Sequence, residues 1–396
     1  MILEMVTSEN FRDEDYLNAN PDARNSILNG EFETAREHYN SHNQEIRYQY
    51  KKFSAPSPCE LIVSTSGSRD LLKKIEGNFI HLENVNSNYK NIYAEPDFLK
   101  SDKIGLTSQF QEHSGQYHAK YYNPQLFIHY LKLALEMTGI DYAEPDIFDF
   151  GSGSGNSVFA ALEVFDRCSI MASDLSVELL SILNTIREEQ YPDANIPCIA
   201  MDIQKTRLKD SSFDIFMGLA ILHHVIEPDI VFEIAYNALK RNGCLILFEP
   251  MIGYQILGGI YKTIVAMDRF MDAGERLPEN IKSALNALSF DYLVRVKMYD
   301  EMIHCKITDL DDKWIFSSKH IIEMAERAGF KTVKIQGLAQ HPRYKSELAG
   351  VLPLVDVDIK EMPEWAIEII ANFDLFDIES GYNDVHFASA VVCIKD

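Results

Sequence analysis

Hydrophobic and polar positions follow two different periods through the middle of the chain. Short apolar runs end in an acidic or small polar residue, and stretches with apolar positions at helical spacing separate them. Strands that alternate with helices are typical of a parallel sheet covered by helices on both faces, so we predict a doubly wound α/β fold. The predicted strands are 146–150, 169–174, 196–201, 212–218 and 244–250.

The pattern changes after residue 250. The stretch 251–312 carries apolar positions at helical spacing and predicts a helical insertion into the sheet. A helix that begins after Ser317, the predicted N-cap, and a strand at 331–335 resume the alternation. A second insertion is predicted at 339–386, before a closing strand at 388–394.

The first hundred residues have a different character. Residues 1–52 are polar and helical in pattern, whereas short alternating runs predict strands at 59–63, 78–82 and 89–93. We therefore expect five parts: an N-terminal helical module (1–52), a small β-rich scaffold unit (53–107), the core of the sheet (108–250), a helical insertion (251–312), and the C-terminal part of the sheet with its second insertion (313–396).

Composition excludes several classes of partner. The 396 residues are 46% hydrophobic and 24% charged, which is typical of globular proteins. The net charge is −23, from 37 basic and 60 acidic residues. An acidic surface repels phosphate backbones, so nucleic acid and anionic membranes are not expected partners. We favour solubility over an acidic docking role as the reason for the charge.

The six cysteines show no C-x-x-C spacing, so we expect small core residues in a reducing compartment and predict no metal site. The N-terminus lacks a basic region followed by a long apolar core, so we expect no signal peptide. The apolar stretch 251–266 carries Lys262 and is too short to span a bilayer. We expect a cytoplasmic protein.

The segment 146–155 reads D-I-F-D-F-G-S-G-S-G, a strand that opens directly into alternating glycines. Such glycines let the backbone turn sharply and let a ligand approach the main chain, and the helix that follows offers unpaired N–H groups. The segment predicts a loop for a nucleotide-type cofactor. A dinucleotide loop of the G-x-G-x-x-G type would need glycine where this chain has Asn156.

The register Asp149-x-Gly151-x-Gly153-x-Gly155 resembles motif I of the class I S-adenosylmethionine-dependent methyltransferases. Asp174 at the end of the second strand, Asp202-Ile203 after the third, and the run A-L-K-R-N-G-C-L-I-L-F-E-P at 238–250 stand in the order typical of that family. The resemblance is detailed over 146–250. The unit 314–335 looks like the family's sixth-strand unit, and 388–394 would be its antiparallel seventh strand.

The resemblance implies a seven-stranded Rossmann-like sheet and S-adenosylmethionine as the cofactor. An aspartate at position 174 can accept two hydrogen bonds from ribose hydroxyls, and Asp202 with Ile203 would hold the adenine. The expected cofactor contacts are Asp149, Gly151, Ser152, Gly153, Gly155, Asp174, Leu175, Asp202, Ile203 and Leu219.

Three residues are candidates for catalysis. His223 and His224 follow the fourth strand and Glu249 ends the fifth, at the carboxyl edge where ligands of doubly wound sheets bind. A histidine there could act as a general base near neutral pH. The alternative is that one of the pair packs beneath the loop and orients it. Glu249 is expected to face the acceptor.

Two further segments carry alternatives. Residues 108–123 are rich in aromatic residues and histidine, and we weigh a cover over the cofactor equally against a surface loop. Residues 13–47 resemble a helical module of bacterial proteins found beside polysaccharide enzymes, with His38 and Tyr39 as expected packing residues. By association this resemblance implies a bacterial origin.

These patterns give one leading function and two alternatives. We expect methyl transfer to an oxygen or nitrogen of a small molecule, with a sugar or polysaccharide precursor as a candidate and with 251–312 as lid or acceptor wall. An NAD-dependent nucleotide-sugar oxidoreductase or epimerase is disfavoured by Asn156 and by the lack of a Tyr-x-x-x-Lys pair. The third hypothesis is a non-catalytic cofactor-binding partner in a biosynthetic complex.

Overall fold

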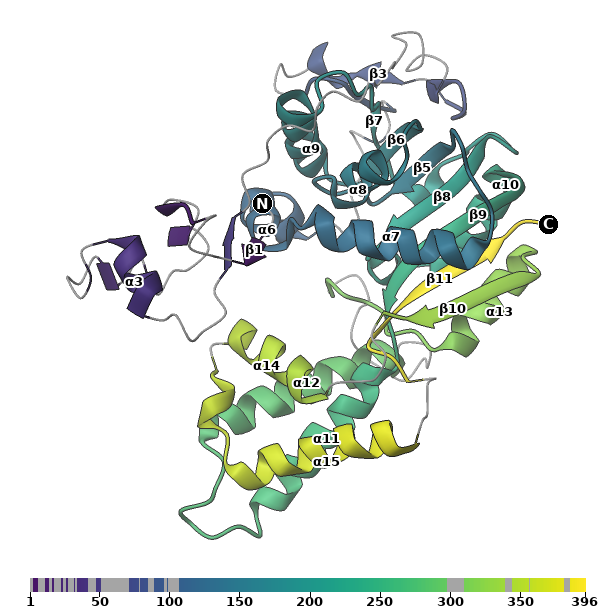
Figure 1. The fold of residues 1–396 in the computed structure, drawn as a ribbon. Coiled ribbons are helices and arrows are strands. Elements are labelled where there is room, and N and C mark those ends of the chain that lie inside the picture. Colours follow the sequence, from purple (N-terminus) through teal and green to yellow (C-terminus); the bar gives the residue numbers. More distant parts are fainter. Residues whose placement is uncertain are drawn as a thin grey trace.

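The seven expected strands form one continuous sheet in the computed structural model (Figure 1). The structure describes residues 3–5, parts of 11–41, 48–50, 71–77, 79–84, 89–95, 98, 107–297, 310–338, 344–355, 357–380 and 385–396.

The strand order is β7-β6-β5-β8-β9-β11-β10 across the central part of the sheet. The first five strands are parallel, and β11 runs antiparallel to both β9 and β10. The doubly wound seven-stranded prediction is confirmed, including the antiparallel last strand. The bounds are β5 (Asp146–Phe150), β6 (Ser169–Asp174), β7 (Cys198–Ala200), β8 (Phe213–Leu219), β9 (Leu239–Pro250), β10 (Thr332–Gly337) and β11 (Ala388–Ile394).

Two short strands extend this sheet beyond β7. β4 (Ile92–Ala94) runs parallel to β7, and β3 (Ile80–His81) pairs with β4 in the antiparallel sense. The strand predicted at 59–63 lies outside the described residues. The described strands of 53–107 therefore continue the main sheet, a pairing that their short apolar runs could not indicate.

Helices cover both faces of the sheet because successive strand residues point to opposite sides. Ile147 packs in one hydrophobic cluster with residues of α7, α8 and α9, whereas the next residue, Phe148, packs in a second cluster with residues of α10 and α13. The bounds are α7 (Pro124–Thr138), α8 (Asn156–Val164), α9 (Val177–Gln190), α10 (Pro228–Ala238) and α13 (Ser318–Ala328). Ser317 caps α13 as predicted, accepting the N–H of His320.

The two predicted insertions pack together into one helical unit below the sheet in Figure 1. Leu257 and Leu285 come from the first insertion and Leu348 and Ile370 from the second, and all four are buried in a shared cluster. The helices of this unit are α11 (Gly253–Asp268), α12 (Glu279–Lys297), α14 (Tyr344–Val351) and α15 (Glu364–Ser380).

The described residues of the N-terminal region include a small buried cluster. Tyr16 is fully buried there, and its hydroxyl lies 3.1 Å from Nδ1 of His38 on α3 (Ala35–Ser41). The helical pattern did not indicate that the ends of the region pair as strands, β1 (Leu3–Met5) with β2 (Tyr48–Tyr50). Across the described part of the chain, no helix has the length and apolar character needed to cross a membrane.

Candidate cofactor-binding site

The glycine loop after β5 has a left-handed backbone conformation at Gly151 and at Gly153. Gly151 has a φ of +64°, and a Cβ there would lie 2.0 Å from Cγ1 of Ile221. Gly153 has a φ of +52°, but a Cβ there would meet nothing within 4 Å. The loop thus needs glycine at 151 for both conformation and packing, whereas at 153 the main chain faces open space.

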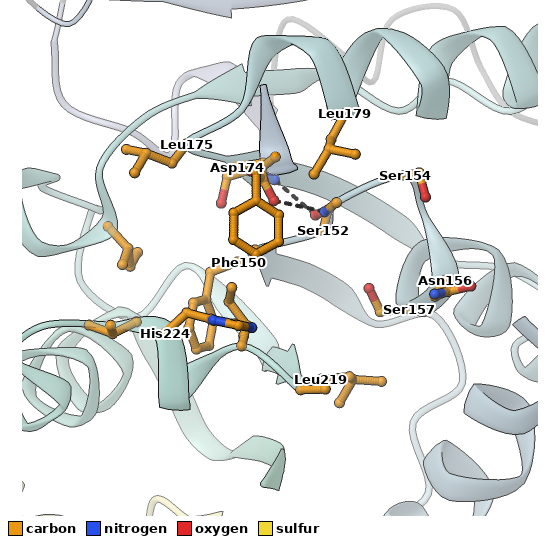
Figure 2. A pocket seen from close by; sticks show the side chains of 18 of the residues that line it. Phe150, Ser152, Ser154, Asn156, Ser157, Asp174, Leu175, Leu179, Leu219 and His224 are labelled. Atoms are coloured by element: carbon orange, nitrogen blue, oxygen red, sulfur yellow. Dashed lines mark hydrogen bonds between the residues drawn. The ribbon is translucent and has the colours of Figure 1, made fainter. Parts of the chain in front are cut away.

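Asp174 connects the end of β6 to this loop (Figure 2). Its Oδ2 accepts the N–H of Gly153 at 2.8 Å, and its Oδ1 accepts the N–H of Ser176 at 2.7 Å. Burial raises the pKa of Asp174 to about 6. Each carboxylate oxygen accepts more than one hydrogen bond, so the side chain keeps capacity for ligand hydroxyls.

Asp149 supports the loop from beneath. It is fully buried, and its Oδ2 accepts a hydrogen bond of 2.7 Å from the hydroxyl of Ser157. Its Oδ1 has no hydrogen-bond partner among the described residues. Burial raises the pKa of Asp149 to about 7. The hydroxyls of Ser152 and Ser173 donate to its backbone carbonyl, which fixes the turn.

A cavity of about 330 Å³ opens at the carboxyl ends of the parallel strands. This volume lies within the range of small-molecule sites. Two of the ten expected cofactor contacts, Asp149 and Gly155, are not among its lining residues; Gly155 is the N-cap of α8. The eight that line it are Gly151, Ser152, Gly153, Asp174, Leu175, Asp202, Ile203 and Leu219.

The expected adenine end combines a carboxylate with apolar side chains. Asp202 caps the short 3-10 helix Ile203–Lys205, accepting the N–H of Gln204 at 3.1 Å, and forms an ion pair with Lys205 at 3.1 Å. Met201 and Ile203 line the same cavity. A carboxylate next to an apolar wall suits an exocyclic amino group on a flat ring.

The aromatic segment 108–123 covers this cavity. Phe110, Tyr117 and Tyr121, from a 3-10 turn (Ser108–Phe110) and α6 (Ser114–Tyr121), all line it. His118 on α6 lies with Nδ1 2.9 Å from the hydroxyl of Ser154 in the glycine loop. Of the two alternatives for this segment, the structure matches the cover. Phe110 and Tyr117 were missing from the expected contacts, although the density of aromatic residues was a usable signal.

Glu249 does not face the cavity. Its carboxylate accepts the backbone N–H groups of Leu222 at 2.8 Å and of His223 at 3.1 Å. It also lies 2.7 Å from Nδ1 of His223. Both Glu249 and His223 are buried and neither lines the cavity. This arrangement differs from the expected acceptor-facing position, because the orphaned N–H groups of the turn draw the carboxylate inward.

His224 does line the cavity. Its Nδ1 lies 2.8 Å from the backbone carbonyl oxygen of Asp311, and its ring packs edge-on against Phe110. Burial lowers the pKa of His224 to about 3, so the ring is neutral at physiological pH. Of the three candidate catalytic residues, His224 is thus the one within reach of a bound ligand.

Residues 148–247 match the family model described as a methyltransferase domain. The match begins in β5 and ends in β9, so it contains the glycine loop, Asp174, Asp202 and the histidine pair. Comparison with the curated proteins gave no match.

Solved structures match parts of this chain at low identity. A Haemonchus contortus phosphoethanolamine N-methyltransferase 2, bound to phosphomonomethylethanolamine and S-adenosylhomocysteine, is 16% identical over 67% of this chain and 52% of its own, with a TM-score of 0.38. The chain spans about half the length of that enzyme. The Bacillus subtilis YcgJ protein is 14% identical over 67% of this chain and 98% of its own (TM-score 0.39). The [4+2]-cyclase SpnF is 16% identical over 68% and 80% (TM-score 0.38).

Residues 148–247 therefore contain a methyltransferase domain, set within a Rossmann-like sheet. Its cofactor is S-adenosylmethionine. The residues present fit this molecule, since an open glycine backbone at 153 and the buried carboxylate of Asp174 lie together at one cavity.

Proposed function

We propose that the protein transfers the methyl group of S-adenosylmethionine to an oxygen or nitrogen atom of a small molecule. The observation that carries this proposal is the Asp174 carboxylate hydrogen-bonded to Gly153 on the wall of a ligand-sized cavity. The bound cofactor supplies an activated methyl group, so the protein must mainly position the acceptor about 3–3.5 Å from that carbon.

Each group at the cavity has a proposed task. Asp174 accepts the ribose hydroxyls, and Asp202 with Ile203 holds the adenine. Asp149 lies behind the cavity wall and fixes the glycine loop through its bonds to Ser152, Ser157 and Ser173. These tasks follow from acceptor capacity and burial at each position.

The acceptor end is assigned to His224, because His224 lines the cavity while His223 and Glu249 lie behind its wall. We assign His223 and Glu249 the task of holding the turn that presents His224, through the bonds of Glu249 to the turn's N–H groups. His224 contacts and orients the acceptor.

A sugar or polysaccharide precursor is the acceptor class we propose. The N-terminal module supports this choice by its resemblance to modules beside bacterial polysaccharide enzymes. The net charge of −23 favours a small molecule over nucleic acid. Cys168, Cys198, Cys244 and Cys393 are free thiols, which suits the reducing cytoplasm that we propose as the protein's location.

Calorimetry with S-adenosylhomocysteine tests the cofactor assignment. We expect wild-type binding and an affinity at least about tenfold lower for Asp174→Ala, because hydrogen bonds to a charged group contribute about 1.5–3 kcal/mol. Asp166→Ala, at an exposed position of the same domain, is the matched control. Undiminished binding by Asp174→Ala would refute the assignment.

A labelled-methyl screen against sugar nucleotides and polysaccharide fragments tests the acceptor class. Incorporation that is lost in Asp174→Ala supports the proposal. Cofactor binding without methylation of any component of a cell extract would instead favour a non-catalytic partner. A nicotinamide fluorescence titration that reports binding would favour the oxidoreductase alternative.

A further inference from the structure

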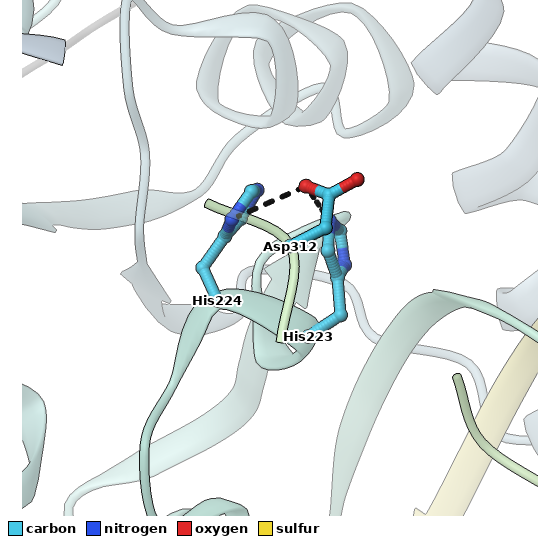
Figure 3. Close-up of side chains that lie close together, drawn as sticks. All are labelled: His223, His224 and Asp312. Carbon is cyan, nitrogen blue, oxygen red and sulfur yellow. Dashed lines mark ion pairs between the residues drawn. The ribbon is translucent and has the colours of Figure 1, made fainter. Parts of the chain in front are cut away.

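His223, His224 and Asp312 lie close together at the border of the cofactor cavity, and all three are residue types that bind metal ions (Figure 3). One ligand atom from each of the three residues lies within 4.8 Å of the other two. The histidines follow β8, whereas Asp312 ends the first insertion. Two backbone bonds hold these segments together: the N–H groups of Lys313 and Trp314 donate to the carbonyl of His223, at 2.8 and 3.3 Å.

The spacing of the cluster is too wide for hydrogen bonds. Oδ1 of Asp312 lies 3.6 Å from Nε2 of His223 and 3.5 Å from Nδ1 of His224. Neither contact is a good hydrogen bond at such a length. Two atoms bound to one tetrahedral metal ion at about 2.1 Å are separated by about 3.4 Å, which is close to both spacings.

His223 is already oriented as a metal ligand. Its Nδ1 lies 2.7 Å from the buried carboxylate of Glu249, so the Nδ1 proton is held there. The Nε2 atom, on the side of Asp312, then carries the free lone pair. A carboxylate that holds the second nitrogen of a metal-binding histidine is the usual outer-shell arrangement.

The charges around the cluster favour a cation. The carboxylates of Glu249, Asp291 and Asp312 contact this network, and Asp311 adjoins it with a buried Oδ1 that has no hydrogen-bond partner among the described residues. The opposing cations are Arg295, 3.4 Å from Asp312, and Lys313, whose ammonium group donates to the carbonyls of Leu310 and Asp311. Among the carboxylate, ammonium and guanidinium groups, four carboxylates stand against two cations.

We propose that His223, His224 and Asp312 bind one divalent transition-metal ion of the zinc type beside the cofactor cavity. Two imidazoles and one carboxylate suit zinc better than magnesium, which prefers oxygen ligands. Nδ1 of His224 faces the carbonyl oxygen of Asp311, so metal binding there requires the tautomer that carries the ring proton on Nε2. Three protein ligands leave a fourth position open, as in catalytic zinc sites.

A metal ion at this place would also have a catalytic use, and that use rests on the proposed function. His224 lines the cavity, so an acceptor hydroxyl bound to the ion there would have a lowered pKa and would release its proton to solvent. Its oxygen would then form a bond to the methyl carbon as the bond from that carbon to the sulfonium sulfur breaks. Binding of the ion itself requires neither cofactor nor methyl transfer, so it is measured separately.

Zinc calorimetry on the full-length, chelator-treated protein tests the site. We expect one zinc ion per chain, with an affinity at least about tenfold lower in Asp312→Asn and in His223→Gln, since even outer-shell changes act on that scale. His129→Gln, at an exposed position of α7, is the matched control and should bind as the wild type does. Thermal unfolding of each metal-free variant verifies that it folds.

Cobalt(II) gives a second readout that adventitious surface binding does not reproduce. The wild type should develop visible absorption bands of a four-coordinate ion, and Asp312→Asn should not. Equal zinc affinity in wild type and Asp312→Asn, or an equal loss in His129→Gln, would overturn the site. A protein that binds zinc but no S-adenosylhomocysteine would overturn the proposed function and leave the metal site standing.

Discussion

Asp149 and Asp174 are both buried next to the glycine loop, and burial raises the pKa of each carboxyl group. The backbone N–H groups that Asp174 accepts offset part of this burial cost. Because its pKa is about 6, the ionisation of Asp174 changes within an accessible pH range. Ribose hydroxyls bind best to the ionised form, which accepts hydrogen bonds with both oxygens.

Cofactor affinity should therefore fall as the pH is lowered from 8 to 5. The pKa of Asp174 is raised to about 6, so the carboxylate is ionised at pH 8 and mostly protonated at pH 5. Calorimetry with S-adenosylhomocysteine across this range measures the effect. Asp174→Asn should bind weakly at every pH and keep only the dependence that comes from Asp149, whose pKa burial raises to about 7. An affinity that rises toward pH 5 would contradict the assignment of Asp174 to the ribose.

Alanine at the two neighbouring glycines should separate stability from binding. Gly151→Ala forces a Cβ against Ile221 in a left-handed conformation, so we expect a loss of about 2–5 kcal/mol in unfolding free energy. Gly153→Ala meets only the conformational cost, about 1–2 kcal/mol, but places a methyl group in the open space at the cavity. Denaturant titration and cofactor calorimetry compare the two. Equal destabilisation would show that the Ile221 contact has no role.

At the level of elements, Asn156 is one of the side chains that hold the cover over the cavity. Asn156 stands where a dinucleotide loop would have glycine. Its Oδ1 accepts the N–H of Asn123 at 2.8 Å, and its Nδ2 donates to the carbonyl of Tyr121 at 3.1 Å. The side chain thereby ties the junction of α6 and α7 to the first turn of α8.

Asn156→Ala should loosen this cover. Loss of two partly exposed hydrogen bonds, each about 0.5–1.5 kcal/mol, is expected to lower S-adenosylhomocysteine affinity about threefold to tenfold. Hydrogen exchange should quicken across α6 and stay unchanged in α9. Asn280→Ala, which removes a bond to Glu361 in the helical unit, is the control. Unchanged exchange in α6 would mean that other contacts hold the cover.

Elements were predictable where their pattern is local. Strands β5, β6 and β11 begin and end where the sequence pattern places them, because each is a short apolar run bounded by polar or turn-forming residues. The sequence of a short strand does not indicate which other strand it pairs with. The parallel pairing of β4 with β7 depends on a neighbour far along the chain.

The whole molecule joins two insertions that the sequence separates by a helix and a strand of the main sheet. Leu285 from α12 and Ile370 from α15 are fully buried in the same cluster. A hydrophobic stripe on a helix shows that it needs a partner but does not say which one. The helical unit is therefore a property of the assembled fold.

Leu285→Ala should destabilise both insertions together. We expect a loss of about 2–5 kcal/mol, as for other large-to-small changes in a buried core. Hydrogen exchange should quicken in α11, α12 and α15 alike, while β5 and β6 keep their protection. Leu131, a residue of α7, is buried in the cluster on the main sheet. Leu131→Ala should quicken exchange in β5 and β6 and leave α11, α12 and α15 protected. Protection retained in α15 of Leu285→Ala would show that the insertions fold independently.

The sequence by itself determined the doubly wound sheet and the cofactor, because a strand, its glycine loop and the following helix are contiguous and their chemistry is local. It could not rank His223 against His224, since adjacent residues on a turn point in different directions that packing selects. Only the tertiary structure turned Glu249 inward, joined the two insertions and brought Asp312 to the histidines. These arrangements depend on contacts between segments distant in the chain, whose formation is decided by the packing of the whole core.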